Sequence, residues 1–367
     1  MRIAIDGRNI GRSKTGSEVV IRELLRHLMK RGQTQTYYIL TDTDDPSVHD
    51  AIRAVCGDDV TIVTLRARNK FLWAAVAVPR YVRSASIDVF HTEYIVPLFL
   101  PRSVRVVTHI HDVSFAAVPQ YIRWVDRWLL RMLIPRSLRR ADAIIAVSEF
   151  TRDEIIRYYG VSPERITVIR NAAPPQFSRR ATTEEIETVR SRYHLPSQYI
   201  FSLGTMQPRK NIPFLVAAFA RVADKMPDVD LVLSGRRAYN FDRAIEKTIA
   251  QFPHIMHRIH FTGFIADDDL PAVYAAAKTF VFPSLYEGFG IPIVEALSQG
   301  TRVLCNDIPP FREVGGDAVT YADATNLAAF AQSLYTVTMC EAPSDTGLVQ
   351  YSWDDAAQRF YEVLVSS

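Results

Sequence analysis

The sequence predicts an α/β protein made of two Rossmann-like, doubly wound domains. Short β-rich runs alternate with helical patterns along the whole chain, which is the order that a parallel sheet requires, because each crossover between parallel strands takes a helix. The length of 367 residues suits two domains of ordinary size. A break in the alternation separates two such series near residues 172–197.

The first series predicts a domain over residues 1–172. Its helical stretches include Glu18 to Arg31, where Val19, Leu24 and Leu28 fall on one face. The runs typical of strands are 2–6, 36–41, 60–64, 88–91, 104–109 and 143–147.

The second series predicts a domain over residues 198–351, after a linker region over 173–197. The linker contains an Ala-Ala-Pro-Pro turn and a charged helix. Runs typical of strands follow at 199–203, 229–233, 258–262, 279–282 and 302–305. The C-terminal segment 352–367 is predicted to be helical, with Ser352 as its N-cap.

Composition excludes several classes of protein. The chain is 48% apolar and 23% charged, as expected for a globular protein that buries sizeable cores. It has no run of eighteen apolar residues, and residues 1–6 have a strand pattern and not that of a signal peptide. Cys56, Cys305 and Cys340 form neither a metal spacing nor a disulfide framework, which favours a cytoplasmic, reducing location.

Positive charge is concentrated in the first half of the chain. Residues 1–171 hold 26 Lys and Arg against 18 Asp and Glu, a balance of +8, and the remainder has a balance of −5. This asymmetry indicates an anionic partner or surface. Two basic-aromatic stretches account for it: Arg66, Arg68, Lys70, Phe71, Leu72, Trp73, Arg80, Tyr81 and Arg83, and Tyr121, Arg123, Trp124, Arg127, Trp128, Arg131, Met132, Arg136, Arg139 and Arg140.

Two interpretations of these stretches are open. Segments of this composition lie at a lipid headgroup surface in some proteins. Alternatively, they are ordinary helices that pack Trp and Leu inward and keep arginines in water. No nucleic-acid reader motif accompanies the charge, so no nucleic-acid partner is expected.

Residues 283–300, PSLYEGFGIPIVEALSQG, carry the most specific signal for function. The glutamates Glu287 and Glu295 stand eight positions apart. Gly288 and Gly290 permit a tight turn after a buried strand, and Pro292 suits the first turn of a helix. One carboxylate therefore lies in a loop and the other in the first turns of a helix, and each can accept hydrogen bonds from a hydroxyl-rich group.

This segment resembles the E-x7-E motif of retaining glycosyltransferases with the GT-B fold, in family 4, which includes bacterial mannosyl- and glucosyltransferases. The resemblance covers essentially the whole chain and implies two Rossmann-like domains that face a cleft. It also implies that Glu287 contacts the transferred sugar and Glu295 the ribose. Gly288, Phe289, Gly290 and Ile291 would border the donor. The alternative is that Glu287 caps a turn and Glu295 is a solvated helix position.

The second domain opens with a strand that ends at Gly204, followed by Arg209 and Lys210 and then a helix. Two cations at the carboxyl end of a strand, beside a helix N-terminus, are placed to bind a diphosphate. The resemblance implies that they neutralise the leaving nucleoside diphosphate. Some family members carry an arginine directly after the glycine; this chain has Thr205 instead. A solvated basic pair is the alternative.

In the first domain, an apolar strand precedes His109, His111 and Asp112. The resemblance matches His111 to a histidine near the hydroxyls of the donor sugar. A metal site formed by these three residues and a purely structural histidine are the alternatives.

Two loops complete the expected donor site. The first βα turn contains Gly16, which the resemblance places near the diphosphate, and Phe264 and Ile265 match a segment whose backbone contacts the base. The turn lacks the regular G-x-G-x-x-G fingerprint, so neither a nicotinamide nor a flavin cofactor is expected.

Two acidic clusters also suggest a metal site. They are Asp42, Asp44 and Asp45, which precede Pro46, and residues 267–269. Both are interpreted as turns before helices, where carboxylates favour the positive end of the dipole. No metal is therefore expected.

The resemblance implies a retaining transferase that moves a hexose from a nucleotide sugar to a glycan or lipid-linked oligosaccharide acceptor in surface polysaccharide synthesis. GDP-mannose is the preferred donor, and a UDP-sugar of glucose or N-acetylglucosamine is the alternative. The donor is expected on the second domain, the acceptor on the first, and the C-terminal helix back on the first. The expected location is cytoplasmic, with peripheral contact at the inner face of the membrane. A non-catalytic nucleotide-sugar-binding protein is the competing class; nothing in the sequence indicates a phosphorylase or an epimerase.

Overall fold

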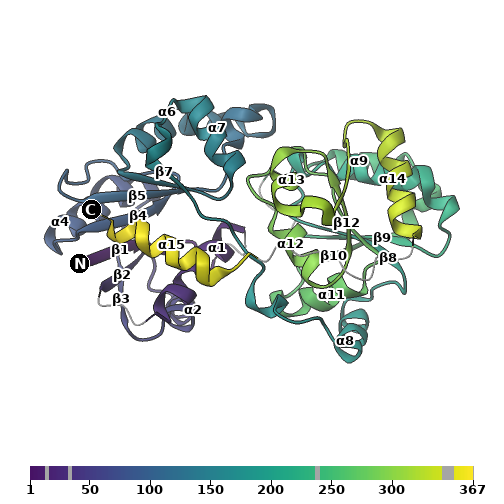
Figure 1. Cartoon of the computed structure of the whole chain (residues 1–367), viewed down its shortest axis with the longest axis horizontal. Coiled ribbons are helices and arrows are strands. Elements are labelled where there is room, and N and C mark those ends of the chain that lie inside the picture. The colour runs from purple at the N-terminus through teal and green to yellow at the C-terminus, as the bar shows by residue number, and fades with distance from the viewer. Residues whose placement is uncertain (13–15, 32–34, 236–239, 341–350, 367) are drawn as a thin grey trace. The chain divides into compact units, whose positions relative to one another are not determined.

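The computed structural model describes residues 1–12, 16–31, 35–235, 240–340 and 351–366. It divides into two compact units (Figure 1). Unit 1 contains Met1–Ala117, Trp124–Ala172 and Tyr351–Ser367, and unit 2 contains Val118–Arg123 and Ala173–Gln350. Each unit is described by itself.

Unit 1 is built on a sheet in which every strand pairing is parallel. The strand order is β3-β2-β1-β4-β5-β6-β7, so the direction of winding reverses between β1 and β4. The carboxyl ends of the two strands at such a reversal border the crevice where doubly wound sheets bind ligands. The strands are β1 (Arg2–Asp6), β2 (Thr36–Thr41), β3 (Val60–Thr64), β4 (Val89–Glu93), β5 (Arg105–Ile110), β6 (Ala143–Ala146) and β7 (Ile166–Val168).

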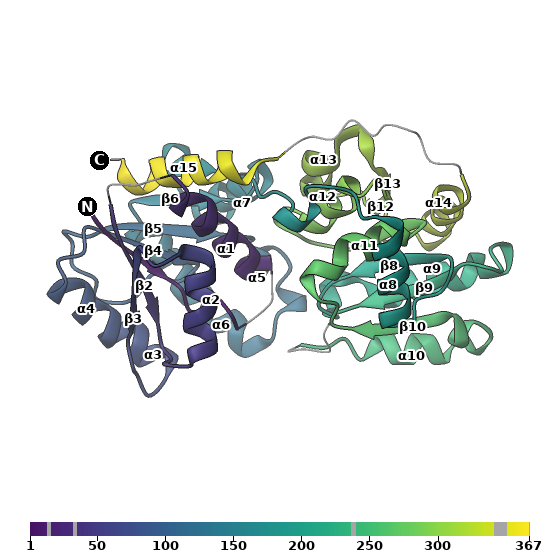
Figure 2. The same ribbon diagram turned by 90° about the horizontal axis from the view of Figure 1, so that it is seen from below.

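Helices cover both faces of this sheet (Figure 2). Phe90 of β4 packs with Val78 and Val82 on one face. His91, the next residue, points to the other face and contacts Phe360 there. The helical elements of unit 1 are α1 (Gly16–Met29), α2 (Pro46–Cys56), α3 (Lys70–Leu72), the π-helix η1 (Trp73–Ala77), α4 (Val78–Ser84), α5 (Ser114–Ala117), α6 (Trp124–Arg140), α7 (Glu149–Tyr159), the 3-10 turn η3 (Pro163–Arg165) and α15 (Trp353–Val365).

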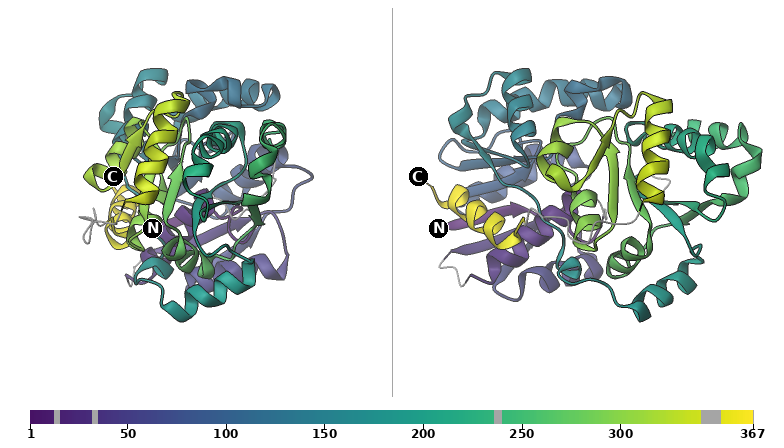
Figure 3. Two further views of the ribbon diagram at one scale, coloured as in Figure 1. Left: turned by 90° about the vertical axis from the view of Figure 1, so that its right-hand side faces the viewer. Right: turned by 45° about the vertical axis from the view of Figure 1, so that its right-hand side comes forward.

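The C-terminal helix α15 returns to unit 1 and lies alongside α1 (Figure 3). Ser352 caps it, because its hydroxyl accepts from the backbone N–H groups of Asp354 and Asp355, at 3.1 and 3.4 Å. The predicted N-cap is therefore confirmed. A hydrogen bond of 2.7 Å joins His27 Nδ1 to Asp354 Oδ1 and attaches the helix to α1.

Unit 2 repeats the same architecture with six parallel strands. Their order is β10-β9-β8-β11-β12-β13, and the winding reverses between β8 and β11. The strands are β8 (Tyr199–Leu203), β9 (Asp230–Ser234), β10 (Ile259–Gly263), β11 (Thr279–Phe282), β12 (Arg302–Asn306) and β13 (Thr320–Ala322). The α-helices are α8 (Thr183–Tyr193), α9 (Ile212–Val222), α10 (Ala244–Ala250), α11 (Leu270–Ala276), α12 (Ile291–Ser298), α13 (Pro309–Gly315) and α14 (Leu327–Met339).

Residues 173–197, for which the sequence predicts a linker, lie in unit 2. Helix α8 begins with a capping box between Thr182 and Glu185 and packs against α11. At its end, Arg192 and Tyr193 both bind Asp269, at 2.7 and 2.6 Å. These tertiary bonds make the charged helix part of the folded unit.

The predicted fold class, two α/β domains with parallel sheets, is confirmed. All eleven predicted strands are present, with ends that differ by no more than two residues. Two strands at sheet edges were not predicted, β7 and β13. Each has three residues, too few for an apolar pattern to be recognised.

Candidate functional site

The best-formed polar cluster of unit 2 lies where the winding of its sheet reverses. The loop after β8 holds the 3-10 turn η5 (Pro208–Lys210), and the loop after β11 holds residues 283–290. Hydrogen bonds to backbone carbonyls join these loops: Leu285 N–H donates to the Arg209 carbonyl at 2.8 Å, and Arg209 Nη1 donates to the Tyr286 carbonyl at 3.0 Å. The position of Arg209 is thus set by backbone on both sides of the reversal.

Glu287 is the counter-ion of both predicted phosphate-binding cations. Its Oε2 lies 2.9 Å from Arg209 Nη1, and its Oε1 pairs with Lys210 Nζ. All three side chains are no more than 18% exposed. Burial alone would raise the pKa of Glu287, but the adjacent Arg209 and Lys210 outweigh it and lower that pKa to about 2. In the unliganded chain, the two cations therefore share one buried carboxylate.

Glycines make room for this cluster. Gly204, which ends the strand, has φ +154°, and a Cβ there would lie 3.4 Å from Lys210 Cε. Gly290 precedes α12 with φ +121°, a conformation that L side chains rarely adopt. The Lys210 ammonium also lies 4.7 Å from the centre of the Phe282 ring. Lys210 therefore lies between the Phe282 ring, Gly204 and the Glu287 carboxylate.

Glu295 lies inside α12 and is buried, with 7% of its surface exposed. The alternative interpretation of Glu295 as a solvated helix position is therefore wrong. Its Oε2 accepts a hydrogen bond of 2.8 Å from the Tyr274 hydroxyl. Burial raises the pKa of Glu295 to about 7; the Tyr274 bond opposes this, and the charge of Asp267 adds to it. A carboxyl with this pKa changes its charge near neutral pH.

The other predicted donor residues occupy two places in unit 2. Gly288 and Phe289 are buried in the loop that carries Glu287, and Ile291 begins α12. Phe264 and Ile265 follow β10, which is separated from β11 by β9 and β8 in the sheet. Ile265 is buried, whereas Phe264 is 37% exposed. Their assignment to the base remains a prediction.

Unit 1 has its own polar cluster at the reversal between β1 and β4. His111, just beyond β5, forms a hydrogen bond of 2.8 Å between its Nε2 and Oε1 of Glu93, the last residue of β4. Asn9 Nδ2 in the turn after β1 donates to Glu93 Oε2. Neither Glu93 nor Asn9 was predicted from the sequence. The signal that could have found Glu93 is the alternation of His91 and Glu93 in β4, which puts both side chains on one face.

The other two polar residues of the histidine segment have different surroundings. His109 is 1% exposed, and burial lowers its pKa well below 6.5. Asp112 Oδ1 accepts from Ser114 N–H at 2.9 Å and so stabilises the turn before α5. Within the described residues, no group of three or more His, Cys, Asp or Glu is arranged to hold a metal ion.

Gly16 is the first residue of α1 and is exposed. A Cβ at Gly16 would meet nothing within 4 Å, so local packing among the described residues does not explain the glycine. Its predicted place near the diphosphate remains a prediction.

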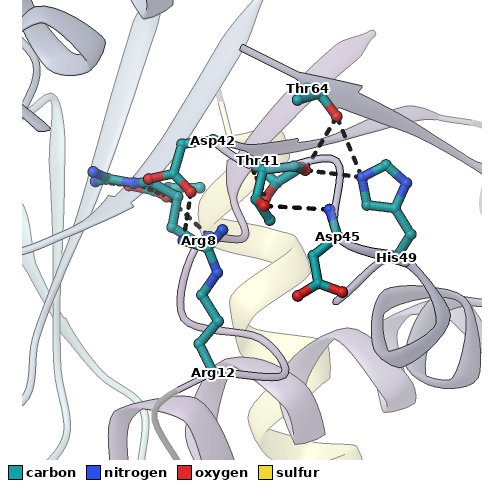
Figure 4. A network of polar contacts seen from close by, with 9 residues as sticks. Arg8, Arg12, Thr41, Asp42, Asp45, His49 and Thr64 are labelled. Atoms are coloured by element: carbon teal, nitrogen blue, oxygen red, sulfur yellow. Dashed lines mark hydrogen bonds and ion pairs between the residues drawn. The ribbon is translucent and has the colours of Figure 1, made fainter. Parts of the chain in front are cut away.

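The first acidic cluster forms separate ion pairs and a helix cap. Figure 4 shows Asp42 beside Arg12, whereas the carboxylate of Asp45 is turned elsewhere. Asp45 accepts from the Ser47 N–H at 2.9 Å and caps α2, as predicted. Asp42 pairs with Arg12 instead, and Asp44 with Arg66, both at 2.5 Å. The helix-cap interpretation is thus confirmed for one of the three carboxylates and wrong for the other two.

The second acidic cluster forms the predicted turn before a helix, but its carboxylates do not cap that helix. Asp267–Asp269 form a 3-10 turn directly before α11, and α11 has no side-chain cap. The carboxylate of Asp269 is turned to Arg192 and Tyr193 of α8. Ion pairing between helices therefore outweighs capping here.

The basic-aromatic stretches are only partly buried. Trp73 is 1% exposed and lies under the Arg8 guanidinium, 3.7 Å from its ring centre, so the inward-packing interpretation holds for it. In α6, Trp124, Trp128 and Met132 are 81%, 66% and 61% exposed, so that interpretation is wrong there. No helix in the described part of the chain is both long and apolar enough to span a bilayer.

Two family models match consecutive parts of the chain. The model described as Glycosyltransferase Family 4 matches residues 14–177, and the one described as Glycosyl transferases group 1 matches residues 186–344. The junction between them falls close to the boundary between the units at residues 172 and 173.

Two curated relatives are mannosyltransferases of Escherichia coli. The chain is 35% identical over 275 residues to O-antigen chain mannosyltransferase B, a match that covers 70% of this chain and 69% of the relative. It is also 35% identical over 182 residues to the serotype-specific mannosyltransferase WbdA. That match covers 49% of this chain but only 22% of WbdA, so the chain spans about a fifth of that relative.

Solved structures support the same fold. The chain superposes on HepE of Anabaena, solved in complex with UDP and glucose, with a TM-score of 0.72 and 18% identity over 100% of this chain and 99% of HepE. At this identity the likeness shows the GT-B fold alone. Together with the family models and the E. coli relatives, it establishes that the chain belongs to the glycosyltransferases of family 4.

Proposed function

We propose that the chain transfers mannose from GDP-mannose to a glycan or lipid-linked oligosaccharide acceptor in surface polysaccharide synthesis. The observation that carries this proposal is the cluster of Arg209, Lys210 and Glu287 at the winding reversal of unit 2, in a chain whose curated relatives include O-antigen mannosyltransferases. Charge develops on the leaving β-phosphate during transfer, and fixed cations stabilise that charge. A buried carboxylate beside them is available to the sugar hydroxyls.

The proposed reaction retains the configuration at the anomeric carbon. The bond from C1 of mannose to the β-phosphate oxygen breaks, and its electron pair leaves with GDP. The acceptor oxygen forms its bond to C1 on the same face, and its proton passes to the leaving phosphate. Arg209 and Lys210 would hold the phosphates, Glu287 the sugar and Glu295 the ribose. No metal or cofactor takes part in this scheme, so transfer is expected to persist in EDTA.

Substitution of the cations tests the diphosphate site. Arg209→Ala and Lys210→Ala should each weaken GDP binding by about 1.5–3 kcal/mol, the contribution of a charge-assisted hydrogen bond. Isothermal titration calorimetry measures this, with Arg312→Ala as the matched control, since Arg312 pairs with Asp307 on the surface of the same unit. Wild-type GDP affinity in both single variants would overturn the assignment.

A UDP-sugar donor is the second candidate, because HepE binds UDP and glucose in the same fold. A donor panel of GDP-mannose, UDP-glucose and UDP-N-acetylglucosamine, assayed by nucleoside diphosphate release with an acceptor extract, separates the two. We expect the highest kcat/KM with GDP-mannose. Binding of every donor without release from any of them would indicate a non-catalytic binding protein.

We further propose that unit 1 contacts an anionic membrane surface. Helix α6 exposes Trp124, Trp128 and Met132 together with Arg127 and Arg131. A second exposed group, Phe71, Leu72 and Val76, belongs to α3 and η1. Both groups lie on one side of the sheet, because Ser137 of α6 bonds Val96, which packs in the same core cluster as Trp73 and Val78.

A lipid-linked acceptor would be presented at such a surface. Exposed aromatic side chains enter the interface between headgroups and acyl chains, and the arginines bind anionic headgroups. This supports a peripheral location at the inner face of the cell membrane.

A further inference from the structure

Glu93 is a nearly buried carboxylate whose direct partners in the described part of the chain are a histidine and an asparagine. Its side chain is 9% exposed, and its two oxygens bond His111 Nε2 and Asn9 Nδ2. Among the described residues, no Lys or Arg lies within ion-pair distance of it. A buried carboxylate is costly unless its hydrogen bonds are satisfied. Two directed bonds across the winding reversal therefore indicate that Glu93 is there to orient its partners.

His111 is held by its edge and by its face. Glu93 binds the Nε2 edge of the ring at 2.8 Å. The ring of His109 stacks on His111 with centres 4.5 Å apart and planes inclined by 20°. Tyr94 borders the same ring at 5.6 Å between centres. These contacts fix the plane of the imidazole and its rotation within that plane.

The histidines behind His111 are uncharged at neutral pH. His91 and His109 are fully buried, and none of their ring nitrogens has a hydrogen-bond partner among the described residues. Burial lowers the pKa of His91 to about 3 and that of His109 well below 6.5. His111 therefore stacks on a neutral ring, and Glu93 is the group that decides which of its nitrogens carries the proton.

A carboxylate can only accept a hydrogen bond, so the Nε2 edge that meets Glu93 carries a proton. In the neutral ring, Nδ1 is then the acceptor. Nδ1 of His111 has no partner among the described residues and, unlike the nitrogens of His91 and His109, it is not buried. The acceptor edge of the ring is thus open to a ligand at the carboxyl end of the sheet.

We propose that Glu93 is a positioning residue that fixes His111 as the Nε2–H tautomer, so that Nδ1 accepts a hydrogen bond from a sugar hydroxyl. This inference rests on the proposed glycosyl transfer for the identity of the ligand. The tautomer itself does not depend on that function, because the contacts that set it are all within unit 1. The two parts can therefore be tested separately.

The tautomer is measured by long-range ¹H–¹⁵N NMR on the full chain with ¹⁵N-labelled histidine. His111→Gln identifies the His111 signal by its loss. In the wild-type chain, at a pH where the imidazole is neutral, we expect His111 with a protonated Nε2 and an unprotonated Nδ1. Glu93→Gln should raise the Nδ1–H population, because an amide can donate to Nε2 as well as accept from it. Asn9→Ala, which leaves the carboxylate in place, should cause a smaller change.

The same variants are assayed for transfer. Glu93→Gln should lower kcat at least tenfold while GDP affinity stays within twofold of wild type, since the diphosphate cations lie in unit 2. The matched control is Asp354→Asn, which removes the other His–carboxylate hydrogen bond of unit 1, the one to His27 on α1. This control should leave both the His111 signal and kcat unchanged.

The outcomes separate the inference from the proposed function. A neutral wild-type His111 that carries its proton on Nδ1 overturns the inference, as does a Glu93→Gln chain with unchanged tautomer or unchanged kcat. If the wild-type chain transfers no sugar from any donor, the proposed function fails. The NMR result then still decides whether Glu93 fixes His111.

Discussion

Glu295 is a buried carboxyl that ionises near neutral pH, and this has a consequence for nucleotide binding. Burial raises its pKa to about 7. If it accepts hydrogen bonds from the ribose hydroxyls, the bound nucleotide favours the ionised form and lowers that pKa. The affinity for GDP should therefore rise as the pH rises through 7 and level off above it.

This pH dependence can be isolated with one variant. Below pH 7, each unit of pH should cost up to about tenfold in Kd, because the site must first lose a proton. GDP itself titrates in this range, so calorimetric affinities between pH 5.5 and 8.5 are compared with those of Glu295→Gln. The difference between the two profiles should follow a single ionisation near pH 7. Parallel profiles would show that Glu295 does not contact the nucleotide.

Glu287 is expected to weaken GDP binding, whereas ionised Glu295 is expected to strengthen it. Because its carboxylate pairs with both Arg209 and Lys210 in the unliganded chain, a diphosphate bound by these cations would compete with Glu287. Glu287→Gln should therefore tighten GDP binding by roughly tenfold, or about 1.4 kcal/mol. The same variant should lower kcat, since the sugar loses a carboxylate partner. Calorimetry and steady-state kinetics measure the two effects.

The matched control for Glu287→Gln is Asp307→Asn, which removes a carboxylate from the exposed pair with Arg312 in the same unit. Asp307→Asn should change neither the affinity for GDP nor kcat. Weaker GDP binding by Glu287→Gln would mean that the carboxylate aligns the cations for the diphosphate and does not compete with it. A wild-type kcat would contradict the role of Glu287 in transfer.

Among the elements, α6 combines features that a helix packed wholly inside a protein would not have. Trp124 and Trp128 are exposed on the helix that also exposes Arg127 and Arg131. Replacement of both tryptophans by alanine should abolish flotation with phosphatidylglycerol vesicles at low salt. The arginines should make the wild-type binding salt-sensitive, at about 1 kcal/mol per cation near the surface.

Two controls accompany the vesicle experiment. GDP affinity should stay unchanged in the double variant, because the diphosphate site is in the other unit. Met256→Ala removes a comparably exposed apolar side chain from unit 2 and should not affect flotation. Equal vesicle binding by the double variant and the wild-type chain would leave α6 without a role at the membrane.

The strands could be predicted from the sequence more completely than the contacts between side chains. Short β-rich runs of four to six residues predicted eleven strands, whereas β7 and β13 were too short to be recognised. Within the loops, the sequence indicated Arg209 and Lys210 because cations between a strand and a helix N-terminus have a local reason to be there. Their pairing with the distant Glu287 depends on the adjacency of β8 and β11 and has no local signature.

The first unit was harder to interpret for the same reason. Glu93 ends a strand, and the only local signal for it is its alternation with His91, which does not by itself identify a site. Its partners Asn9 and His111 come from two other segments. For the acidic cluster at 267–269, the local sequence indicated carboxylates that stabilise the start of a helix. In the structure, Asp269 instead binds Arg192 and Tyr193, which are distant in the sequence.

At the scale of the whole molecule, buried histidines make unit 1 sensitive to acid. The pKa values of His91 and His109 are lowered by burial, whereas in the unfolded chain a histidine has a pKa near 6.5. Below about pH 6.5 the unfolded state binds protons that the folded state does not. The free energy of unfolding should therefore fall by up to about 1.4 kcal/mol per pH unit for each of these histidines, down to about pH 3 for His91.

Tryptophan fluorescence can follow this loss of stability in unit 1 alone, because all four tryptophans of the chain belong to that unit. They are Trp73, Trp124, Trp128 and Trp353.

Glu295 has the opposite effect on stability between pH 4.5 and 7, since its raised pKa stabilises the folded chain as the pH falls. Urea titrations are therefore run in a Glu295→Gln background. His91→Gln should reduce the pH dependence of the free energy of unfolding by the contribution of one histidine. Substitution of the exposed His257 by Gln should leave that pH dependence unchanged. An unaltered pH dependence in His91→Gln would contradict the assignment.

The pairing of Glu287 with both Arg209 and Lys210 also bears on how a turnover would end. After transfer, a nucleoside diphosphate held by two cations in a nearly buried loop would leave slowly if nothing replaced it. In the proposed reaction, Glu287 would become available at that moment, because the sugar would have moved to the acceptor. Its return to the cations would displace the product, so the carboxylate that helps to start the reaction would also expel the spent nucleotide. Product inhibition by GDP should accordingly be stronger in Glu287→Gln than in the wild-type chain.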